Sequence, residues 1–185
     1  MTSAPAITPE KRGPALAVGD VVVYASHGVG RVTSVNKTTN GTPGTIVVEC
    51  AGTLTVSLPI DLANTYLRPV SGEREIAKVK RVLRGEECIV DQTWSKRLRA
   101  NREKLGTGGA VGLAEIVRDG AHRDRRLVER RGKVASPSER DLCRRARQLL
   151  ADEIGSARGI TPEDAATWID LQIAAQPVDE APIDE

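Results

Sequence analysis

Aromatic residues are scarce in this chain of 185 residues, which holds no Phe, two Tyr and two Trp. With 39% hydrophobic residues the composition is nevertheless that of a globular protein, so its cores must be built from Val, Ile, Leu and Ala. The chain also lacks a run of about 18 apolar residues, and its N-terminus lacks an apolar stretch of signal-peptide length. We therefore expect a cytoplasmic protein that does not enter a membrane.

Cysteine and histidine are too few and too dispersed to form a metal site. Cys50, Cys88 and Cys143 lie far apart, and His27 and His122 have no close Cys or His neighbour in the sequence. Zinc sites need such ligands in closely spaced pairs. We expect the cysteines to be small buried side chains in a reducing compartment, and we expect neither a metal nor a cofactor.

Catalytic motifs are also missing. Gly28 and Gly30 could begin a phosphate-binding loop, but Thr33 stands where the dinucleotide-binding fingerprint needs its third glycine. Glycines between two β-type runs more often mark a bulge or a close strand bend. His27 could act as a base, but no nucleophile or acid can be paired with it from the sequence, and a turn or surface histidine is the simpler explanation. The chain is therefore predicted not to be an enzyme.

Charge is distributed unevenly, although the formal net charge is only +2. Residues 94–147 hold 16 Lys and Arg against 7 Asp and Glu, whereas residues 148–185 hold 1 against 9. A segment as basic as the first is typical of a surface that binds phosphates or an acidic partner, and an exposed helix surface without a ligand is the alternative. The acidic segment either screens the basic one or simply aids solubility.

Short strands dominate the first part of the chain. Residues 1–16 contain three Pro together with Ser, Thr and Gly, which predicts a disordered arm. From Val18 to about Val70, Val-rich runs alternate with turn signals such as Asn40-Gly41. In residues 53–58 apolar and polar residues alternate, as in a half-exposed antiparallel strand. Four or five such strands predict a small antiparallel β-barrel.

Helical periodicity follows. Five helices are predicted: residues 73–84, 94–105 and about 111–131, and two more that begin near residues 137 and 162. The last two are marked by a cap residue followed by Pro, at Ser136 and Thr161. Gly106 is expected to end the second helix, and Gly120 to weaken the middle of the third. These segments predict a compact all-α domain.

The predicted fold class is therefore α+β with two domains. The expected boundaries are a disordered N-terminal arm at residues 1–16, a β-barrel domain at residues 17–70, a helical domain at residues 71–176 and an acidic tail at residues 177–185. No internal repeat is visible.

The most informative segment is a basic helix that begins with a tryptophan. Leu98 and Leu105 mark a narrow buried stripe, and Trp94 stands at the helix start, where free backbone N–H groups can face a phosphate. An indole at the edge of a basic surface can insert at a base step while the cations hold the DNA backbone. Packing of Trp94 into the helical core, as expected for Trp168, is the equally weighted alternative.

Two motifs resemble those of the CarD/CdnL family of bacterial transcription regulators. Residues 18–30 and 54–59 look like the N-terminal domain of that family, a module that also occurs in transcription-repair coupling factor. Residues 94–105, which begin Trp-Ser-Lys-Arg, look like its DNA-binding helix. The resemblance extends over about residues 17–157.

The resemblance implies a Tudor-like domain that binds the β subunit of bacterial RNA polymerase, and a helical domain that contacts promoter DNA at the upstream edge of the transcription bubble. There Trp94 would wedge into the minor groove and stabilise the open complex, in a monomer associated with the nucleoid. The expected DNA-binding residues are Trp94, Lys96, Arg97, Arg99, Arg102, Lys104 and Arg145. The expected partner-binding residues are Thr38, Val48, Thr53, Thr55 and Ser57.

Two departures and one rival accompany this hypothesis. Ser57 and Thr38 stand where members of the family often carry a basic residue, which predicts a weaker or different polymerase contact. The rival is a protein-interaction module whose basic helical domain binds an acidic protein partner without DNA. A fragment of a repair translocase is disfavoured, because no nucleotide-binding motif is present.

Overall fold

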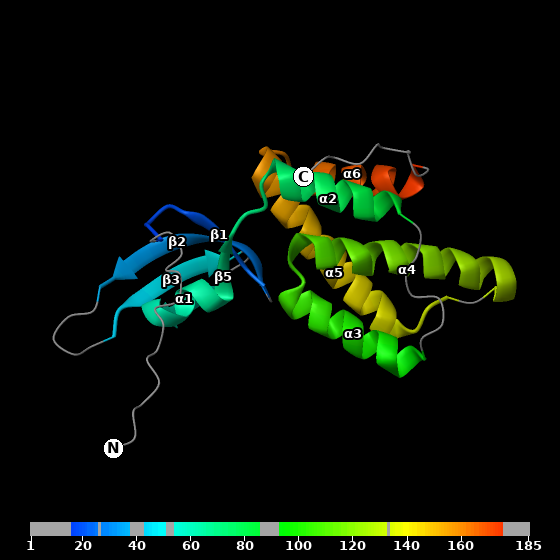
Figure 1. The fold of residues 1–185 in the computed structure, drawn as a ribbon, viewed down its shortest axis with the longest axis horizontal. Coiled ribbons are helices and arrows are strands. Elements are labelled where there is room, and N and C mark those ends of the chain that lie inside the picture. Colours follow the sequence, from blue (N-terminus) through cyan, green and yellow to red (C-terminus); the bar gives the residue numbers. More distant parts are fainter. Residues whose placement is uncertain are drawn as a thin grey trace, which may run out of the picture.

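The computed structural model describes residues 16–25, 27–37, 43–50, 54–85, 93–132 and 134–175. They form an α+β fold with a β lobe (residues 16–69) beside a helical lobe (residues 73–174), arranged along the long axis (Figure 1). Each lobe has its own cluster of buried apolar residues. None of the described helices is long and apolar enough to cross a membrane.

The β lobe contains a five-stranded antiparallel sheet. Its strands are β1 (Val21–Tyr24), β2 (Gly28–Asn36), β3 (Thr45–Cys50), β4 (Thr55–Pro59) and β5 (Leu67–Pro69), in the spatial order β4-β3-β2-β1-β5. Alternate residues of the central strands, such as Val22, Val32, Ile46 and Val48, are buried on one face of the sheet. This period of two is the one expected for strands with a single buried face.

A short helix, α1 (Ile60–Tyr66), follows Pro59 and was not predicted from the sequence. It contacts β3, β4 and β5 and buries Ala63 in the core of the β lobe. The edge strands β4 and β5 do not pair with each other in the described part of the chain, so α1 covers the gap between them. The predicted barrel is therefore an antiparallel sheet bridged by a helix rather than one closed by strand pairing.

The two glycines near the start of β2 are explained by close packing. Gly28 has a φ of 88°, a region that favours glycine, and an added Cβ there would lie 3.0 Å from Leu149 Cδ2. An added Cβ at Gly30 would lie 2.7 Å from Val48 Cγ1 on the neighbouring strand. Both positions need a residue without a side chain, as expected for a close approach of backbone, and His27 is exposed in the turn beside them.

The described residues of the helical lobe form five helices. They are α2 (Glu73–Arg84), α3 (Trp94–Thr107), α4 (Gly109–Arg131), α5 (Pro137–Arg158) and α6 (Pro162–Ala174). The central helix α5 packs against α3, α4 and α6 and buries Leu149, Leu150 and Ile154. Its predicted start is confirmed, because Ser136 and Glu139 form a reciprocal capping box. Thr161 caps α6 in the predicted way, accepting a hydrogen bond from the backbone of Asp164.

Two glycines behave differently from the prediction. Helix α3 continues past Gly106 to Thr107, and α4 runs unbroken through Gly120. An added Cβ at Gly120 would lie 2.6 Å from Cys143 Sγ, so the missing side chain lets α4 approach α5 closely. Burial raises the pKa of the Cys143 thiol to about 11, which keeps it protonated and unreactive at neutral pH. Cys143 is a partly buried free thiol and Cys50 a buried one, and Cys88 lies outside the described residues.

Candidate nucleic-acid interface

Helix α3 presents a basic face to solvent. Lys96, Arg99 and Arg102 are exposed, and none of them forms an ion pair within the part of the chain that the structure describes. The opposite face is anchored by Leu98, which is buried in the helical core against α4 and α5. The packing of α3 through one narrow stripe leaves these three cations available to a ligand.

The indole N–H of Trp94 is hydrogen-bonded within the protein, while half of the residue's surface is exposed. The side chain stands in the first turn of α3 with 50% relative exposure, and its Nε1 donates a hydrogen bond of 3.0 Å to Ser136 Oγ. Trp168 differs: it packs partly buried against the helical core, with the Arg158 guanidinium 4.6 Å from its ring centre. Of the two positions weighed for Trp94, the structure therefore places it at the surface rather than in the core.

The residue that holds Trp94 is itself fixed. Ser136 Oγ donates to Glu139 Oε2 at 2.9 Å and accepts from the Glu139 backbone N–H at 3.4 Å, at the first turn of α5. One donated and two accepted bonds use the full capacity of a hydroxyl group. The sequence predicts this cap, but it does not predict that the Ser136 hydroxyl also accepts a hydrogen bond from the Trp94 indole of α3. Ser136 and Glu139 are thus structural parts of the site that sequence reasoning missed.

Arg97 corrects one sequence-based expectation. It was expected to face DNA, but it is 4% exposed, and its Nε and Nη2 donate to Glu139 Oε1 at 3.0 and 2.7 Å. The reason is its position on α3 beside Leu98, on the side that packs against α5. Arg97 therefore joins α3 to α5 from inside, and we exclude it from the candidate surface.

Glu139 is the acidic centre of this network. Burial alone would raise its pKa, but hydrogen bonds from Arg97 and Ser136 and the charges of Arg97 and Arg123 outweigh burial and lower the pKa below its ordinary value. Arg123 approaches the same carboxylate, with Nε 3.5 Å from Oε1. Glu139 therefore stays ionised at neutral pH and organises the helix ends beneath Trp94.

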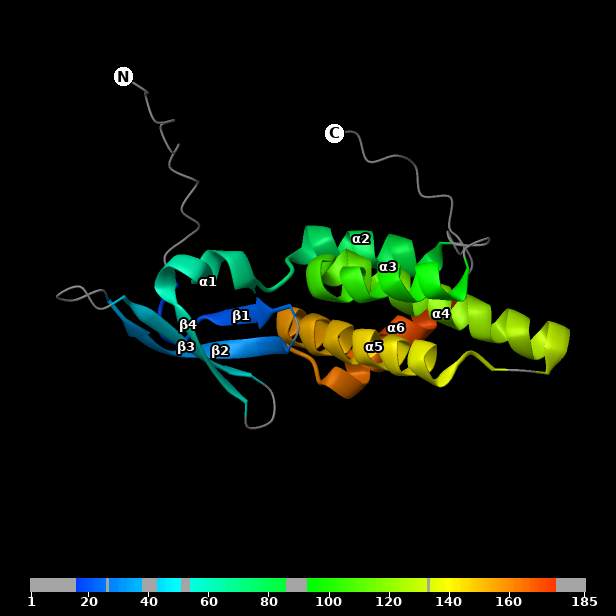
Figure 2. The same ribbon diagram turned by 90° about the horizontal axis from the view of Figure 1, so that it is seen from below.

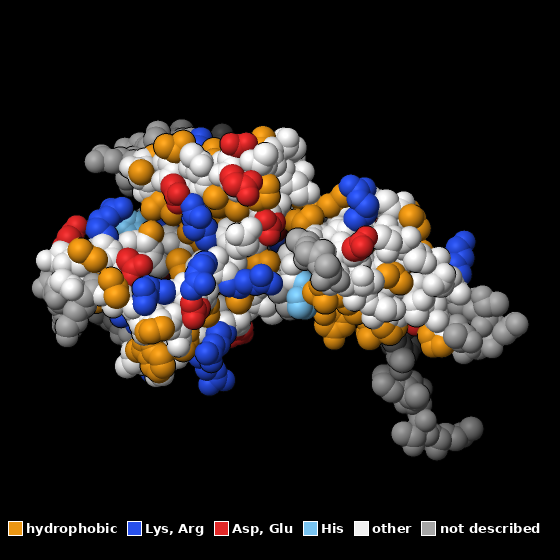
Figure 3. Space-filling model, turned by 180° about the vertical axis from the view of Figure 1, so that it is seen from behind, with side chains coloured by type: hydrophobic (Ala, Val, Ile, Leu, Met, Phe, Trp, Pro, Cys, Tyr) orange, Lys and Arg blue, Asp and Glu red, His pale blue; other side chains and the backbone are white. Residues whose placement is uncertain are grey.

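The remaining predicted DNA contacts lie in two environments. Lys104 is partly buried and its Nζ lies 2.6 Å from Glu115 Oε2, so its charge is partly neutralised within the protein. Arg145 is exposed on α5, where its charge acts on Asp152. On the face shown in Figure 3, most Lys and Arg side chains gather over the helical lobe, and Asp and Glu are interspersed among them.

The β lobe offers an edge strand as a second surface. β4 lies at one end of the sheet order, and Thr55 and Ser57 point outward while Val56 and Leu58 are half-buried. Val48 was expected at this surface, but it is fully buried: it shares the inner face of β3 with Ile46 and pairs with Val56. It is removed from the candidate surface. The predicted contacts Thr38 and Thr53 lie outside the described residues.

No group of three or more His, Cys, Asp or Glu that could hold a metal ion occurs among the described residues. In the described part of the chain, the two surfaces expose groups suited to binding: cations and an indole on α3, and on β4 a strand edge with hydroxyl side chains that pairs with no further described strand.

Comparisons with known proteins match both lobes. Residues 16–71 match the family model described as "CarD-like/TRCF RID domain", and residues 78–170 match the model described as "CarD, C-terminal domain". The chain is also similar to the protein named "Putative transcription factor YdeB" of Bacillus subtilis (strain 168). The two are 23% identical over 155 residues, which cover 82% of this chain and 97% of the relative.

Proposed function

We propose, from the premise that the chain belongs to the CarD family of transcription regulators, that it stabilises open promoter complexes as a monomer. In this proposal the β lobe binds the β subunit of bacterial RNA polymerase, and α3 binds promoter DNA at the upstream edge of the transcription bubble. Trp94 inserts into the minor groove. The observation that carries the proposal is the half-exposed indole at the start of a basic helix.

The geometry of α3 supports a wedge. A minor-groove wedge needs an apolar side chain that is exposed yet rigid, with cations beside it for the phosphates. Trp94 is anchored through its N–H to Ser136, and Lys96, Arg99 and Arg102 are exposed along the same helix. The first turn of α3 beside Trp94 can add backbone donors, because the Thr93 side chain makes no cap hydrogen bond.

No chemical step is needed for this activity. A factor that binds the open promoter more tightly than the closed promoter shifts the equilibrium by the difference between the two binding free energies. A wedge provides such a difference, because it stacks on bases only where the duplex is already unstacked or melted.

The polymerase contact is assigned to the β4 edge. An unpaired strand edge can accept a strand from a partner through backbone hydrogen bonds, and outward side chains then set specificity. Thr55 and Ser57 supply small hydroxyl groups there. The basic residue expected at position 57 from the family is absent, which predicts a weaker contact.

Salt dependence separates DNA binding from the rival function, in which the helical lobe binds an acidic protein. Promoter duplex should bind the full chain with an affinity that falls steeply as salt increases, and Arg99→Ala should reduce the slope of log K against log salt by about 1. Arg81→Ala, at an exposed arginine of α2, is the matched control and should leave the slope unchanged. Absence of any duplex binding at low salt would favour the acidic protein partner.

A charge added at β4 tests the polymerase surface. Ser57→Arg should increase the amount of RNA polymerase retained by the immobilised full chain, because it restores the basic side chain that the family often carries at an exposed position of the edge strand. Thr33→Arg adds the same charge at an exposed position of β2, away from the edge, and should have no effect. Equal retention by the wild type and the Ser57 variant would show that the contact lies elsewhere.

A further inference from the structure

A partly buried ion pair connects the two lobes, with Glu153 buried and Arg68 about one third exposed. The Arg68 guanidinium of β5 donates two hydrogen bonds to Glu153 of α5, from Nη1 to Oε1 at 2.5 Å and from Nη2 to Oε2 at 2.6 Å. Ser71 adds two more to the same carboxylate, from its hydroxyl at 2.6 Å and from its backbone N–H at 3.2 Å. Four donors on one carboxylate are close to its full capacity.

Glu153 depends on the β lobe for this pairing. Its side chain is 1% exposed and belongs to α5, next to the core residue Ile154. A buried carboxylate without a cation is strongly unfavourable, and the cation that Glu153 contacts, Arg68, comes from β5 rather than from the helical lobe. Ser71 lies in the short connection between β5 and α2, so the ion pair and the chain crossing occur at the same place.

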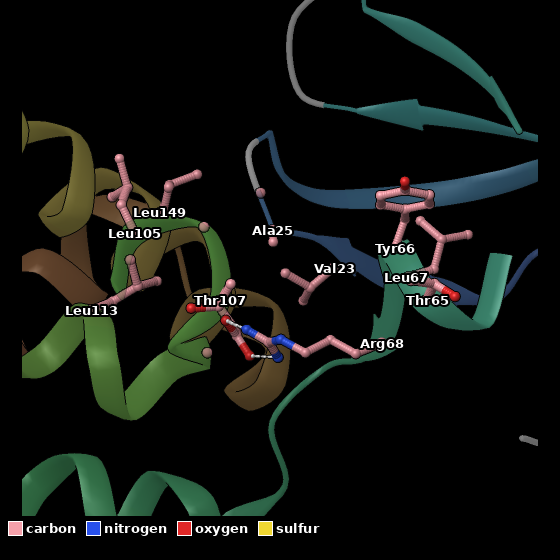
Figure 4. Close-up of a pocket in the computed structure, with 14 residues that line it drawn as sticks. Val23, Ala25, Thr65, Tyr66, Leu67, Arg68, Leu105, Thr107, Leu113 and Leu149 are labelled. Carbon is pink, nitrogen blue, oxygen red and sulfur yellow. Dashed lines mark hydrogen bonds and ion pairs between the residues drawn. The ribbon is translucent and has the colours of Figure 1, made fainter. Parts of the chain in front are cut away.

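Among the described residues, the rest of the contact between the lobes is made mainly by β2 and α5. The buried clusters of the two lobes are separate. Gly28 lies against Leu149 of α5, and the end of α5 lies beside β2 (Figure 2). Between this contact and Arg68 is a cavity of about 280 Å³, lined from one side by Val23 and Tyr66 and from the other by Leu105 (Figure 4). Packing alone therefore leaves room for the lobes to reorient.

We propose that the Arg68–Glu153 pair, together with Ser71, fixes the angle between the β lobe and the helical lobe. The pair acts as a clamp that lets polymerase binding on β4 place Trp94 at the promoter. This inference rests on the proposed function for its consequence, although the clamp itself concerns the free chain. Arg68, Glu153 and Ser71 are positioning residues: they touch neither partner.

Rigidity matters because the molecule bridges two partners. Once one surface is bound, the other meets its target at an effective concentration set by the geometry of the connection. A loose connection spreads Trp94 over many positions, and this lowers that concentration without changing the affinity of either surface alone. The clamp should therefore affect the assembled complex and not the binary ones.

The double variant Arg68→Met/Glu153→Leu removes the clamp without leaving a buried charge. Replacement of a buried ion pair by apolar side chains of similar size is commonly tolerated. Arg68→Met alone would leave the buried Glu153 carboxylate without a cation. Arg68→Lys is the conservative variant, which keeps the positive charge but loses the bidentate hydrogen bonding to the carboxylate. Arg74→Met, at an exposed arginine of α2, is the control for an Arg→Met substitution away from the clamp.

Residual dipolar couplings of the full chain measure the clamp directly. In the wild type and in Arg74→Met, the amides of both lobes should fit one common alignment tensor. In the double variant the two lobes should need separate alignment tensors of different magnitude. In Arg68→Lys the difference between the tensors of the two lobes should be smaller than in the double variant and larger than in the wild type. A common tensor in the double variant, with the lobes at the wild-type angle, would overturn the inference.

Open-complex lifetime measures the consequence. The double variant should bind promoter duplex and polymerase separately within about twofold of the wild type, yet shorten the lifetime of open complexes about fivefold or more relative to the wild type. Full lifetime despite separate tensors would overturn the positioning role. If the wild type itself fails to prolong open complexes, the proposed function is wrong, and the dipolar couplings alone decide whether the pair fixes the lobes.

Discussion

Replacing Arg97 with alanine should lower the free energy of unfolding by about 3–5 kcal/mol at neutral pH. The side chains of Arg97 and Glu139 are 5% and 12% exposed, so removal of the guanidinium leaves an ionised carboxylate in a poorly solvated place. The loss should appear in chemical denaturation of the full chain. Arg99→Ala, two positions along the same helix but at an exposed site, should change the same quantity by about 0.5 kcal/mol or less.

The pH dependence identifies the cause of this loss. The pKa of Glu139 is lowered in the folded protein, so its ionic contribution to stability is complete above the ordinary value of 4.5 and is lost as the pH falls through the lower folded pKa. Without Arg97 the carboxylate loses its largest stabilising partner, so its pKa should rise and the carboxyl group of the variant should be neutralised at a higher pH than in the wild type. The difference in stability between wild type and Arg97→Ala should therefore shrink as the pH falls. A difference that is small at neutral pH, or independent of pH, would contradict the buried pair.

Trp94→Ala should weaken binding to a DNA junction of duplex and melted strands by about tenfold or more. Stacking of an aromatic ring on a base contributes about 1–3 kcal/mol, and 1.4 kcal/mol corresponds to a factor of ten in affinity. The half-exposed ring leaves little cavity behind, so the free energy of unfolding should change by about 1 kcal/mol, mostly through the lost bond to Ser136. Fluorescence titration with the junction DNA and chemical denaturation provide the two measurements.

The second tryptophan is the matched control. Trp168→Ala should cost about 3 kcal/mol of stability, because this ring packs against the helical core and under Arg158. It should leave the DNA affinity of the folded protein unchanged. Trp94→Phe keeps a ring but loses the N–H donor. Its affinity for the junction DNA should therefore be lower than that of the wild type and higher than that of Trp94→Ala. A Trp94→Ala protein that unfolds as readily as Trp168→Ala would contradict the surface role.

The parts of the fold that sequence reasoning predicted are those with local causes. The starts of α5 and α6 are determined by a few consecutive residues, because the caps at Ser136 and Thr161 act within one helical turn. α1 was missed because it is short and buries chiefly Ala63, so no apolar stripe distinguishes it from a loop. Its position depends on the two edge strands that it joins, β4 and β5, which are next to it in the sequence but lie at opposite ends of the sheet.

The error at Arg97 comes from a partner that is distant in the sequence. Arg97 and Arg99 look alike in a basic segment, and only the packing of α3 against α5 decides that one meets Glu139 and the other meets solvent. A wider stripe around Leu98 would have placed Arg97 on the inner face. Val48 had a clearer signal, since the period of two puts it on the same face as Ile46.

The lifetime of open promoter complexes after challenge with a competitor is the most direct test of the central claim, that Trp94 stabilises the melted promoter. Polymerase alone, polymerase with the wild type and polymerase with Trp94→Ala should be compared on one linear promoter, with polymerase retention checked separately. The wild type should lengthen the lifetime of the open complexes. The lifetime with Trp94→Ala should be shorter than that with the wild type by about tenfold or more, while Trp94→Ala binds polymerase as the wild type does. A Trp94→Ala protein that prolongs open complexes as well as the wild type would contradict the account.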